Sequence, residues 1–427
     1  MRIADLQAAW ARSDRLLSML ADDAWLELPI RLRQPFLFYL GHLPAFAWNQ
    51  LGRGLLRLAS FTPSFDTLFE RGIDPVGVDS YVPQASWPPR TAVLDYRDRV
   101  RDTLSATLAD APAHGEAVLS MVVEHEWMHQ ETLLYMAQEL DHSLKRRPAD
   151  WPEPPAPRAR EPQGAVEVPE GEAVLGVPKG AAAFGWDNEF GECRVRVPAF
   201  RIDRLPVTNA DWLEFVAAGG YAEPRLWREE DWGWRERRGV LHPHSWRDLT
   251  PFVVRSLFED VPFEVAASWP VQVSWAEASA YARWRGARLP TEAEWHRAAY
   301  GTPDGRPRRW PWGDAAPSAE RACLGFERGS PVGVGSHPAG ASAWGVFETV
   351  GNGWEWTETP FAPLPGFSPM PRYPGYSADF FDGKHFVLKG GSWATEAALL
   401  RPSFRNWFQP HDPHVFSKLR CVTAPAV

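Results

Sequence analysis

The pattern of apolar positions changes about one third of the way along the chain. In residues 1–145, apolar side chains recur every three to four positions, which is the spacing of helices with a buried face. Examples are Leu6, Trp10, Leu16, Leu17 and Leu20. The segments 33–58, about 91–110 and about 114–140 continue this character. Because four helices are the minimum for a closed bundle, we predict a helical bundle over residues 1–145.

Residues 168–427 show short apolar runs that are interrupted by Gly, Pro and Trp. We expect two short helices there, at 208–218 and 274–286, because a Ser or Thr precedes a polar first turn, as a helix N-cap does. Residues 146–167 are rich in Pro, Arg and Glu, which is typical of a linker. The pattern therefore predicts an α+β chain of two domains, 1–145 and 168–427.

The composition adds limits to this division. The 427 residues fit two domains of ordinary size, and the 23 Trp and 41 Pro indicate long ordered loops held by aromatic side chains. The net charge is −9 and no basic patch is visible, so we expect no nucleic-acid partner. Neither a signal peptide nor a membrane-spanning run is visible, so we expect a cytoplasmic protein without a membrane partner.

The clearest candidate for chemistry is the pair His125 and His129 in the sequence HEWMH, on a predicted helix. Side chains at positions i and i+4 lie about 6 Å apart on one helix face. An isolated pair of this kind is often structural, but its apolar neighbours place this one inside the bundle. A second apolar helix offers His42, and a buried imidazole needs a hydrogen bond or a metal ion. We therefore predict a metal site formed by His42, His125 and His129.

The residue types leave the metal open. Three neutral imidazoles with free coordination positions suit either a catalytic zinc ion or an iron ion that binds substrate and oxygen. Glu131 projects about 200° around the helix from His129, so we expect it to face away from the metal. Glu126 has the same difficulty. The sequence therefore predicts a site of three imidazoles without a carboxylate.

The second half of the chain is dense in motifs that contain Trp, Gly and Asn. They include RLPTEAEWHRAAYG, WPWGD, VGNGWEWT, LKGGSWAT and FRNW. Within them Asn352, Glu355, Arg405 and Asn406 are polar groups set among tryptophans, an arrangement by which a pocket fixes a polar ligand. We expect half or more of these motif residues to hold loops together instead.

Both halves resemble known families. The lone His followed much later by HxxxHxE is similar to a DinB-type four-helix bundle. PVTNADW, RLPTEAEW, VGNGWEWT, LKGGSW and FRNW resemble the loop-rich, C-type-lectin-like domain of the formylglycine-generating enzymes (sulfatase-modifying factors). In this order the two halves resemble the ergothioneine sulfoxide synthases. Formylglycine-generating activity itself is not expected, because the copper-binding cysteines of that family are missing.

The resemblance implies a set of reactants and a metal. Fe(II) would be held by His42, His125 and His129, O2 would be the oxidant, and hercynine, an N-trimethylated histidine, would accept a chalcogen atom at imidazole C2. The proton donor would be a tyrosine upstream of GGSW, for which Tyr373 and Tyr376 are the candidates. The other reactant is a chalcogen donor.

The donor site departs from the pattern of the family. After FRNW the family has Asp and, four residues later, Arg, which bind γ-glutamylcysteine; here these positions are Phe408 and Asp412. Met128 stands where the family has a Gln near the imidazole. Because each lost charge-assisted contact costs roughly 1.5–3 kcal/mol, a zwitterionic thiol peptide fits poorly. We therefore favour a neutral selenosugar, the donor of the related selenoneine synthases, over a cysteine-type or γ-glutamylcysteine donor.

The remaining contacts to the substrate follow from the same resemblance. Trp407 is expected to face the trimethylammonium group by cation–π attraction, and Asn406 to bind the carboxylate of hercynine. Phe408 and Asp412 would contact a sugar donor. Two other classes of function stay open: a zinc-dependent hydrolase or thiol transferase on the same bundle, and a binding module without catalysis.

Overall fold

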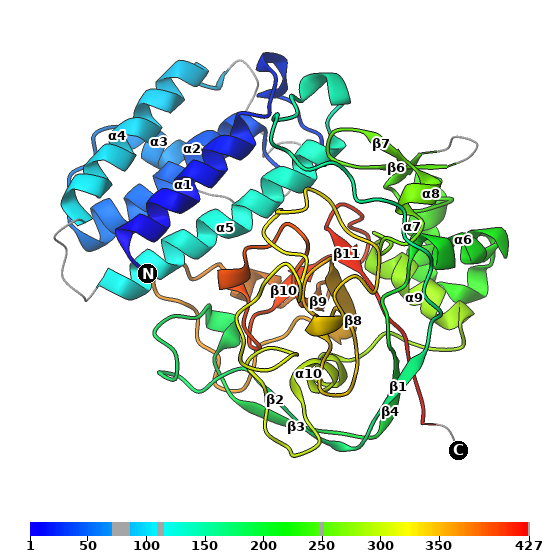
Figure 1. Ribbon diagram of the computed structural model, residues 1–427. Helices are drawn as coiled ribbons and strands as arrows, with labels where there is room; N and C mark the ends of the chain where they lie inside the picture. Colours follow the sequence, from blue (N-terminus) through cyan, green and yellow to red (C-terminus); the bar gives the residue numbers. More distant parts are fainter. Residues whose placement is uncertain (71–85, 109–114, 248–251, 426–427) are drawn as a thin grey trace. The chain divides into compact units, whose positions relative to one another are not determined.

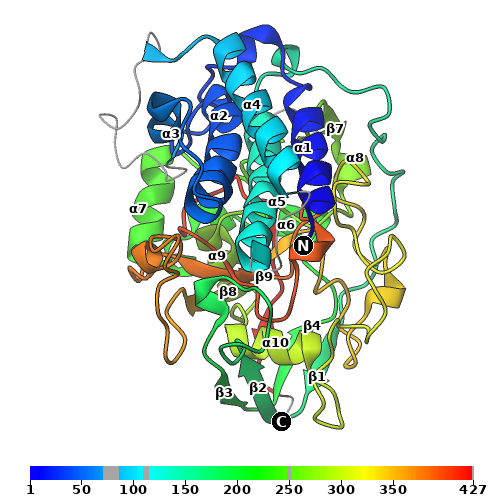
Figure 2. The ribbon, with the colours of Figure 1, turned by 90° about the vertical axis from the view of Figure 1, so that its left-hand side faces the viewer.

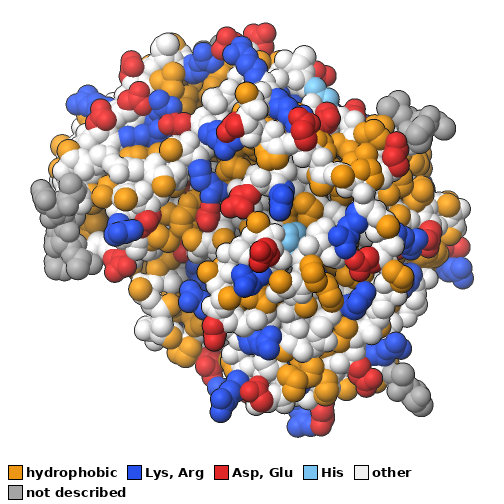
Figure 3. Space-filling view, viewed as in Figure 1, with side chains coloured by type: hydrophobic (Ala, Val, Ile, Leu, Met, Phe, Trp, Pro, Cys, Tyr) orange, Lys and Arg blue, Asp and Glu red, His pale blue; other side chains and the backbone are white. Residues whose placement is uncertain are grey.

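The computed structural model describes residues 1–70, 86–108, 115–247 and 252–425 and divides into two compact units, Met1–Trp151 and Pro152–Val427 (Figure 1). Among the described residues, no helix combines the length and the apolar character needed to cross a lipid bilayer. On the face drawn in Figure 3, positive and negative side chains are interspersed, and neither kind gathers in a continuous patch.

The first unit is a helical bundle, which confirms the prediction from periodicity. Its helices are α1 (Ile3–Leu17), α2 (Phe36–Ala47), α3 (Pro63–Leu68), α4 (Arg90–Leu108) and α5 (Glu116–Glu139). In Figures 1 and 2, α1, α2, α4 and α5 lie side by side, with α1 against α5 and α2 against α4. Every residue of α2 is buried, because this helix lies in the interior of the bundle. Residues 109–110 of the expected third helix lie outside the described residues.

The long second helix predicted over residues 33–58 changes its geometry along its length. The α-helix begins after Pro35, continues past Pro44 and ends at Ala47, and a π-helical segment, Trp48–Leu55, follows directly. Proline lacks the N–H that an α-helix needs in its interior, so a distortion is expected near Pro44. The change to π-helical spacing occurs one turn later.

The second unit is built from small sheets joined by long loops. Its strands are β1 (Ala165–Val168), β2 (Gly171–Leu175), β3 (Cys193–Val197), β4 (Phe200–Asp203), β5 (Trp246–Arg247), β6 (Val253–Arg255), β7 (Asp260–Pro262), β8 (Trp354–Pro360), β9 (Phe386–Lys389), β10 (Asn406–Phe408), β11 (Ser417–Lys418) and β12 (Val422–Thr423). The sheet orders are β10-β9-β8-β11, β1-β4-β12, β2-β3 and β5-β6-β7. β8 pairs with β9 antiparallel and with β11 parallel. The predicted α+β class is confirmed.

Among the described residues, five α-helices are embedded between these strands. They are α6 (Asn209–Ala217), α7 (Glu229–Arg238), α8 (Phe263–Ala266), α9 (Trp275–Trp284) and α10 (Glu292–Tyr300). α6 and α9 confirm the two predicted helices and their N-caps, Thr208 and Ser274. The expectation of two helices was incomplete. α10 begins with the same kind of capping box, in which Thr291 bonds Glu294, but its sequence was interpreted as a loop motif.

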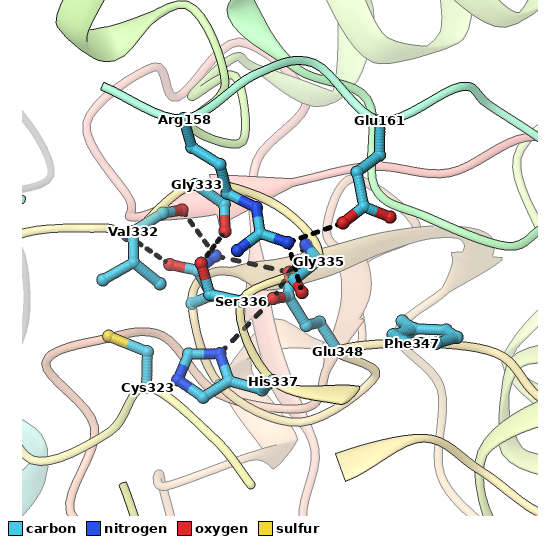
Figure 4. A network of polar contacts seen from close by, with 12 residues as sticks. Arg158, Glu161, Cys323, Val332, Gly333, Gly335, Ser336, His337, Phe347 and Glu348 are labelled. Atoms are coloured by element: carbon cyan, nitrogen blue, oxygen red, sulfur yellow. Dashed lines mark hydrogen bonds and ion pairs between the residues drawn. The ribbon is translucent and has the colours of Figure 1, made fainter. Parts of the chain in front are cut away.

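The segment expected to be a linker, residues 146–167, is in part bound to the second unit. The β1 strand already begins at Ala165. Figure 4 shows Arg158 and Glu161 packed against the loop around Gly335. Arg158 Nη2 donates to Glu161 Oε1 at 2.6 Å and to the carbonyl of Gly335 at 3.2 Å. The chain from residue 152 onward is therefore held by contacts with the second unit.

Candidate metal centre

The first ligand candidate, His42, lies on the fully buried helix α2 and is itself 0% exposed. Its Nδ1 lies 2.7 Å from the carbonyl oxygen of Phe69. A carbonyl only accepts hydrogen bonds, so Nδ1 carries the proton and Nε2 presents its lone pair. The ring of Phe69 can approach because residue 41 is glycine: a Cβ on Gly41 would lie 2.6 Å from that ring.

The other two candidates, His125 and His129, project from one face of α5 toward the same point. The Nε2 of His42 lies 3.2 Å from the Nε2 of His125 and 3.3 Å from that of His129. The third distance, between His125 and His129, is 3.2 Å. The ring of Phe46 stacks on His125 with centroids 3.6 Å apart. The structure therefore brings together the three imidazoles that the sequence singled out.

The three imidazoles are held in the neutral state that metal binding requires. Burial lowers the pKa of His42 to about 4. Burial also lowers the pKa values of His125 and His129, and the neighbouring imidazoles lower them further. Three ring nitrogens about 3.2–3.3 Å apart match ligands of one ion at bond lengths of about 2.0–2.1 Å. The donor set therefore fits a single metal ion.

No carboxylate joins this cluster within the described part of the chain. Glu126, next to His125, instead accepts a hydrogen bond of 2.6 Å from Ser13 on α1, and burial raises its pKa to about 7. Glu131 is also outside the cluster, as its direction on the helix predicts. Among the described residues, this cluster of possible ligands therefore consists of three imidazoles alone.

In the second unit, Tyr376 and Trp407 belong to one aromatic cluster. Tyr376 stacks on Trp186 with ring centroids 4.0 Å apart, and it meets Trp407 edge-on at 5.4 Å. Trp407 stacks face to face on Phe361, with ring centroids 4.2 Å apart. The ring of Tyr373, the alternative candidate, lies 5.7 Å from that of Tyr376. The two candidate tyrosines are therefore neighbours in one turn.

The other candidate substrate residues have different surroundings. Asn406 accepts a hydrogen bond from the backbone N–H of Trp407 at 2.9 Å. Phe408 is half-buried and pairs with β9 through its backbone, and Asp412 accepts a backbone N–H in the turn that follows. Met128 lies in the first unit on α5, one position before a histidine of the cluster, and is half-buried.

Most polar groups of the tryptophan-rich motifs are scaffold. Asn352, at a positive φ of 66°, exchanges hydrogen bonds with both backbone groups of Val332. Glu355 is 0% exposed and receives two hydrogen bonds from the guanidinium of Arg420 at 2.6 and 2.7 Å. Arg405 is bonded in the same bidentate way to a buried glutamate of α10. This is the outcome expected for half or more of these residues.

Sequence reasoning missed the partner of His42 and the aromatic walls of the cluster. The partner is a backbone carbonyl. Because every residue has this group, the amino-acid sequence gives no signal for it. The wall residues Phe38 and Phe46 occur in a run of apolar residues that periodicity interprets only as core. Their spacing from His42, four residues on either side along α2, is the one signal that places them beside it.

Both halves of the chain match known protein families. Residues 5–133 match the DinB superfamily, and residues 152–425 match the sulfatase-modifying factor enzyme 1-like domain. Among solved structures, PvdO from Pseudomonas aeruginosa is similar over 60% of this chain and 93% of its own, at 20% identity and a TM-score of 0.39.

Three relatives each match about three quarters of this chain or more. The hercynine oxygenase of Mycolicibacterium thermoresistibile is 39% identical over 408 residues, which cover 91% of this chain and 87% of the relative. That of Mycolicibacterium smegmatis is 43% identical over 333 residues, covering 76% and 75%. Ergothioneine biosynthesis protein 1 of Neurospora crassa is 31% identical over 98% of this chain and 57% of its own length. The chain therefore belongs to the family in which a DinB-type helical unit precedes a sulfatase-modifying factor domain, the family that includes the hercynine oxygenases.

Proposed function

We propose that this protein is an oxygen-dependent, iron-containing oxidoreductase that forms a carbon–chalcogen bond at imidazole C2 of hercynine. The observation that carries the proposal is the convergence of three neutral imidazoles, two of them buried and that of His129 half-buried, with Nε2 atoms 3.2–3.3 Å from one another. Relatives named hercynine oxygenase and ergothioneine biosynthesis protein 1 support the choice of acceptor. The name ergothioneine biosynthesis protein 1 also supports a biosynthetic role.

His42, His125 and His129 would hold the iron. Bound Fe(II) supplies the reduction of O2 and lowers the pKa of a bound thiol or selenol. The chain itself excludes water from the inner side of the cluster with Phe38 and Phe46, which stack on His42 and His125. The Nδ1–H of His42 stays on the carbonyl of Phe69, so this ligand keeps one tautomer throughout turnover.

Residues of the second unit are proposed to bind and protonate. Tyr376, or its neighbour Tyr373, is the proposed donor of a proton to the reduced oxygen. The half-buried indole of Trp407 offers an aromatic face to a trimethylammonium group, and Asn406 an amide to a carboxylate. Met128, in the first unit, would contact the imidazole of the substrate. Loss of turnover in Tyr376→Phe, which removes only the hydroxyl, together with unchanged hercynine affinity would support the role of Tyr376 as proton donor.

The donor is proposed to be a selenosugar. The argument is the absence of the two charged side chains that a zwitterionic thiol peptide needs, since Phe408 and Asp412 occupy those positions. Asp412 accepts a hydrogen bond from a backbone N–H, so its carboxylate is already oriented. A sulfur donor of the cysteine or γ-glutamylcysteine type, which gives a C–S bond, is the second candidate, and the names of the relatives favour it.

One experiment tests metal, oxidant and donor together. The protein is loaded with Fe(II) under anaerobic conditions, mixed with hercynine and O2, and supplied with either a selenosugar or γ-glutamylcysteine, while O2 uptake and product mass are followed. We expect O2 uptake and a product mass that contains selenium. Turnover with the thiol peptide alone rejects the selenosugar donor. Activity with Zn(II) and without O2 rejects the oxidoreductase.

A matched pair of variants localises the activity. His42→Ala removes a candidate ligand, whereas His296→Ala removes an equally buried histidine of α10 in the second unit. We expect loss of iron binding and turnover in the first variant only. Equal hercynine binding by His42→Ala, together with wild-type turnover, would identify a different metal site.

A further inference from the structure

The imidazole of His42 depends on a carbonyl group from a distant and short helix. Phe69 follows α3 directly, and its N–H continues the helical pattern by donating to Phe65 at 3.0 Å. α3 has only six residues, which is too short for a helix to be stable by itself. Whatever fixes α3 within the first unit therefore also fixes the hydrogen bond to His42.

The carboxylate of Asp66, in the last turn of α3, bonds this helix to other parts of the first unit. Asp66 is 1% exposed. Its Oδ1 accepts from the hydroxyl of Tyr96 on α4 at 2.8 Å, and its Oδ2 accepts from the hydroxyl of Ser60 at 2.6 Å. Its backbone carbonyl accepts from the side chain of Asn49 at 3.1 Å. Three separate parts of the first unit are thus tied to one residue of α3.

The charge of Asp66 suits this role. Each hydroxyl donates to an ionised oxygen, and such charge-assisted hydrogen bonds are about twice as strong as neutral ones. Arg53 lies 3.8 Å from Oδ2 and adds a positive charge at the edge of the buried site. Burial raises the pKa of Tyr96, so its hydroxyl remains a donor at any physiological pH.

We propose that Asp66, tied by Tyr96 and Ser60, is a positioning residue for the metal centre: it orients α3 so that the carbonyl of Phe69 holds the Nδ1–H of His42 and turns Nε2 toward the other two imidazoles. The inference rests on the proposed function for the identity of the metal. The hydrogen bond itself is a property of the chain without metal.

The test uses the full chain and two readouts. The first is the tautomer of His42 in the metal-free protein, read from ¹⁵N chemical shifts of labelled histidine. The second is the affinity for Co(II), followed by titration. In Asp66→Ala we expect loss of the single Nδ1–H tautomer and about 10-fold weaker Co(II) binding, the lower end of the effect of outer-shell partners. Tyr96→Phe and Ser60→Ala each remove one donor and should give smaller changes in the same direction.

Asp14→Ala is the matched control. Asp14 on α1 also bonds to side chains of α4, namely Arg97 and Arg101, and its hydrogen bonds and ion pairs among the described residues do not involve α3. We expect this variant to keep the tautomer and the Co(II) affinity of the wild type. If Asp66→Ala fails to fold, the tautomer and the Co(II) affinity of Tyr96→Phe and Ser60→Ala test the positioning role of Asp66.

The two proposals fail differently. A wild-type protein that binds no Co(II) at His42 overturns the proposed function. The tautomer of His42 still tests the positioning role of Asp66 in that case. Wild-type tautomer and Co(II) affinity in folded Tyr96→Phe, Ser60→Ala and Asp66→Ala overturn the role of Asp66 and leave the metal centre in place.

Discussion

Buried imidazoles occur in both units, and burial has the same consequence in each. In α10 the imidazole of His296 is 5% exposed, and its Nδ1 has no hydrogen-bond partner among the described residues. Burial, and to a smaller extent the charge of Lys389, lowers the pKa of His296 to about 3. Unlike the three histidines of the first unit, His296 belongs to no group of possible metal ligands among the described residues.

A pH dependence of stability follows from His296. The unfolded chain binds a proton at this position below a pKa of 6.5, whereas the folded chain does so only near pH 3. The contribution of the neutral imidazole to the free energy of unfolding is therefore fully present above pH 6.5, and it is lost as the pH falls. At pH 5.0 the loss is about 2 kcal/mol. We expect His296→Leu to reduce the difference in unfolding free energy between pH 7.5 and pH 5.0 by that amount, measured by urea titration. An unchanged difference would show that the imidazole is protonated in the folded state.

The second prediction at the scale of one residue concerns Gly41. A Cβ there would lie 2.6 Å from the ring of Phe69. Overpacking costs about 1–3 kcal/mol, whereas replacing glycine by alanine in a helix gains about 1 kcal/mol. Because the displaced residue also holds His42, we expect Gly41→Ala to destabilise the protein and to weaken Co(II) binding. In Gly233→Ala, where the nearest atom belongs to the flexible side chain of Arg237, we expect neutral or increased stability.

At the scale of elements, helix starts in the second unit depend on capping boxes. α6, α9 and α10 each begin with a hydroxyl side chain that accepts the N–H three residues later, while an acidic side chain bonds back. These local bonds define short helices between long loops, where little regular structure is present on either side. A Ser or Thr before a polar first turn is also visible in the sequence, which is why α6 and α9 were predicted.

The cap of α10 gives a prediction for an element. Thr291→Ala removes the hydroxyl that accepts from Glu294 N–H at 3.1 Å. We expect a loss of about 1 kcal/mol in unfolding free energy, measured by urea titration. Thr291→Ser keeps the hydroxyl and should restore most of the loss. Equal stability of the Ala and Ser variants would mean that the cap contributes nothing here.

At the scale of the whole molecule, the three imidazoles of the candidate centre, His42, His125 and His129, belong to the first unit, Met1–Trp151. A ligand that binds only the folded state stabilises what it binds, by about 2.7 kcal/mol at a concentration of 100 times Kd. The second unit supplies none of these ligands.

Metal removal should therefore act on one unit. We expect chelation to speed hydrogen exchange of the slowest amides of α2 and α5 by up to about 100-fold, and to leave those of β8 and β9 unchanged. Exchange measured by mass spectrometry, with Co(II) present or removed, checks this. A uniform change in both units would show that the metal stabilises the chain as one cooperative body.

The sequence by itself determined the features that depend on neighbours along the chain. Periodicity predicted the helices of the first unit, hydroxyl caps predicted α6 and α9, and the i, i+4 spacing placed His125 and His129 on one face. These signals are local, because a helix repeats within a few residues. The resemblance of ordered motifs predicted the two families, since motif order is retained in the sequence.

Only the tertiary structure decided which distant groups meet. His42 and His125 are separated by 83 residues, yet their Nε2 atoms lie 3.2 Å apart. The carbonyl of Phe69, which sets the tautomer of His42, has no signature of its own, because every residue carries that group. In the same way, the polar groups of VGNGWEWT could bind a ligand or hold loops together. Only the hydrogen-bond partners of Asn352 and Glu355 in the folded chain show that these two side chains hold loops together. Packing between distant segments determines these roles.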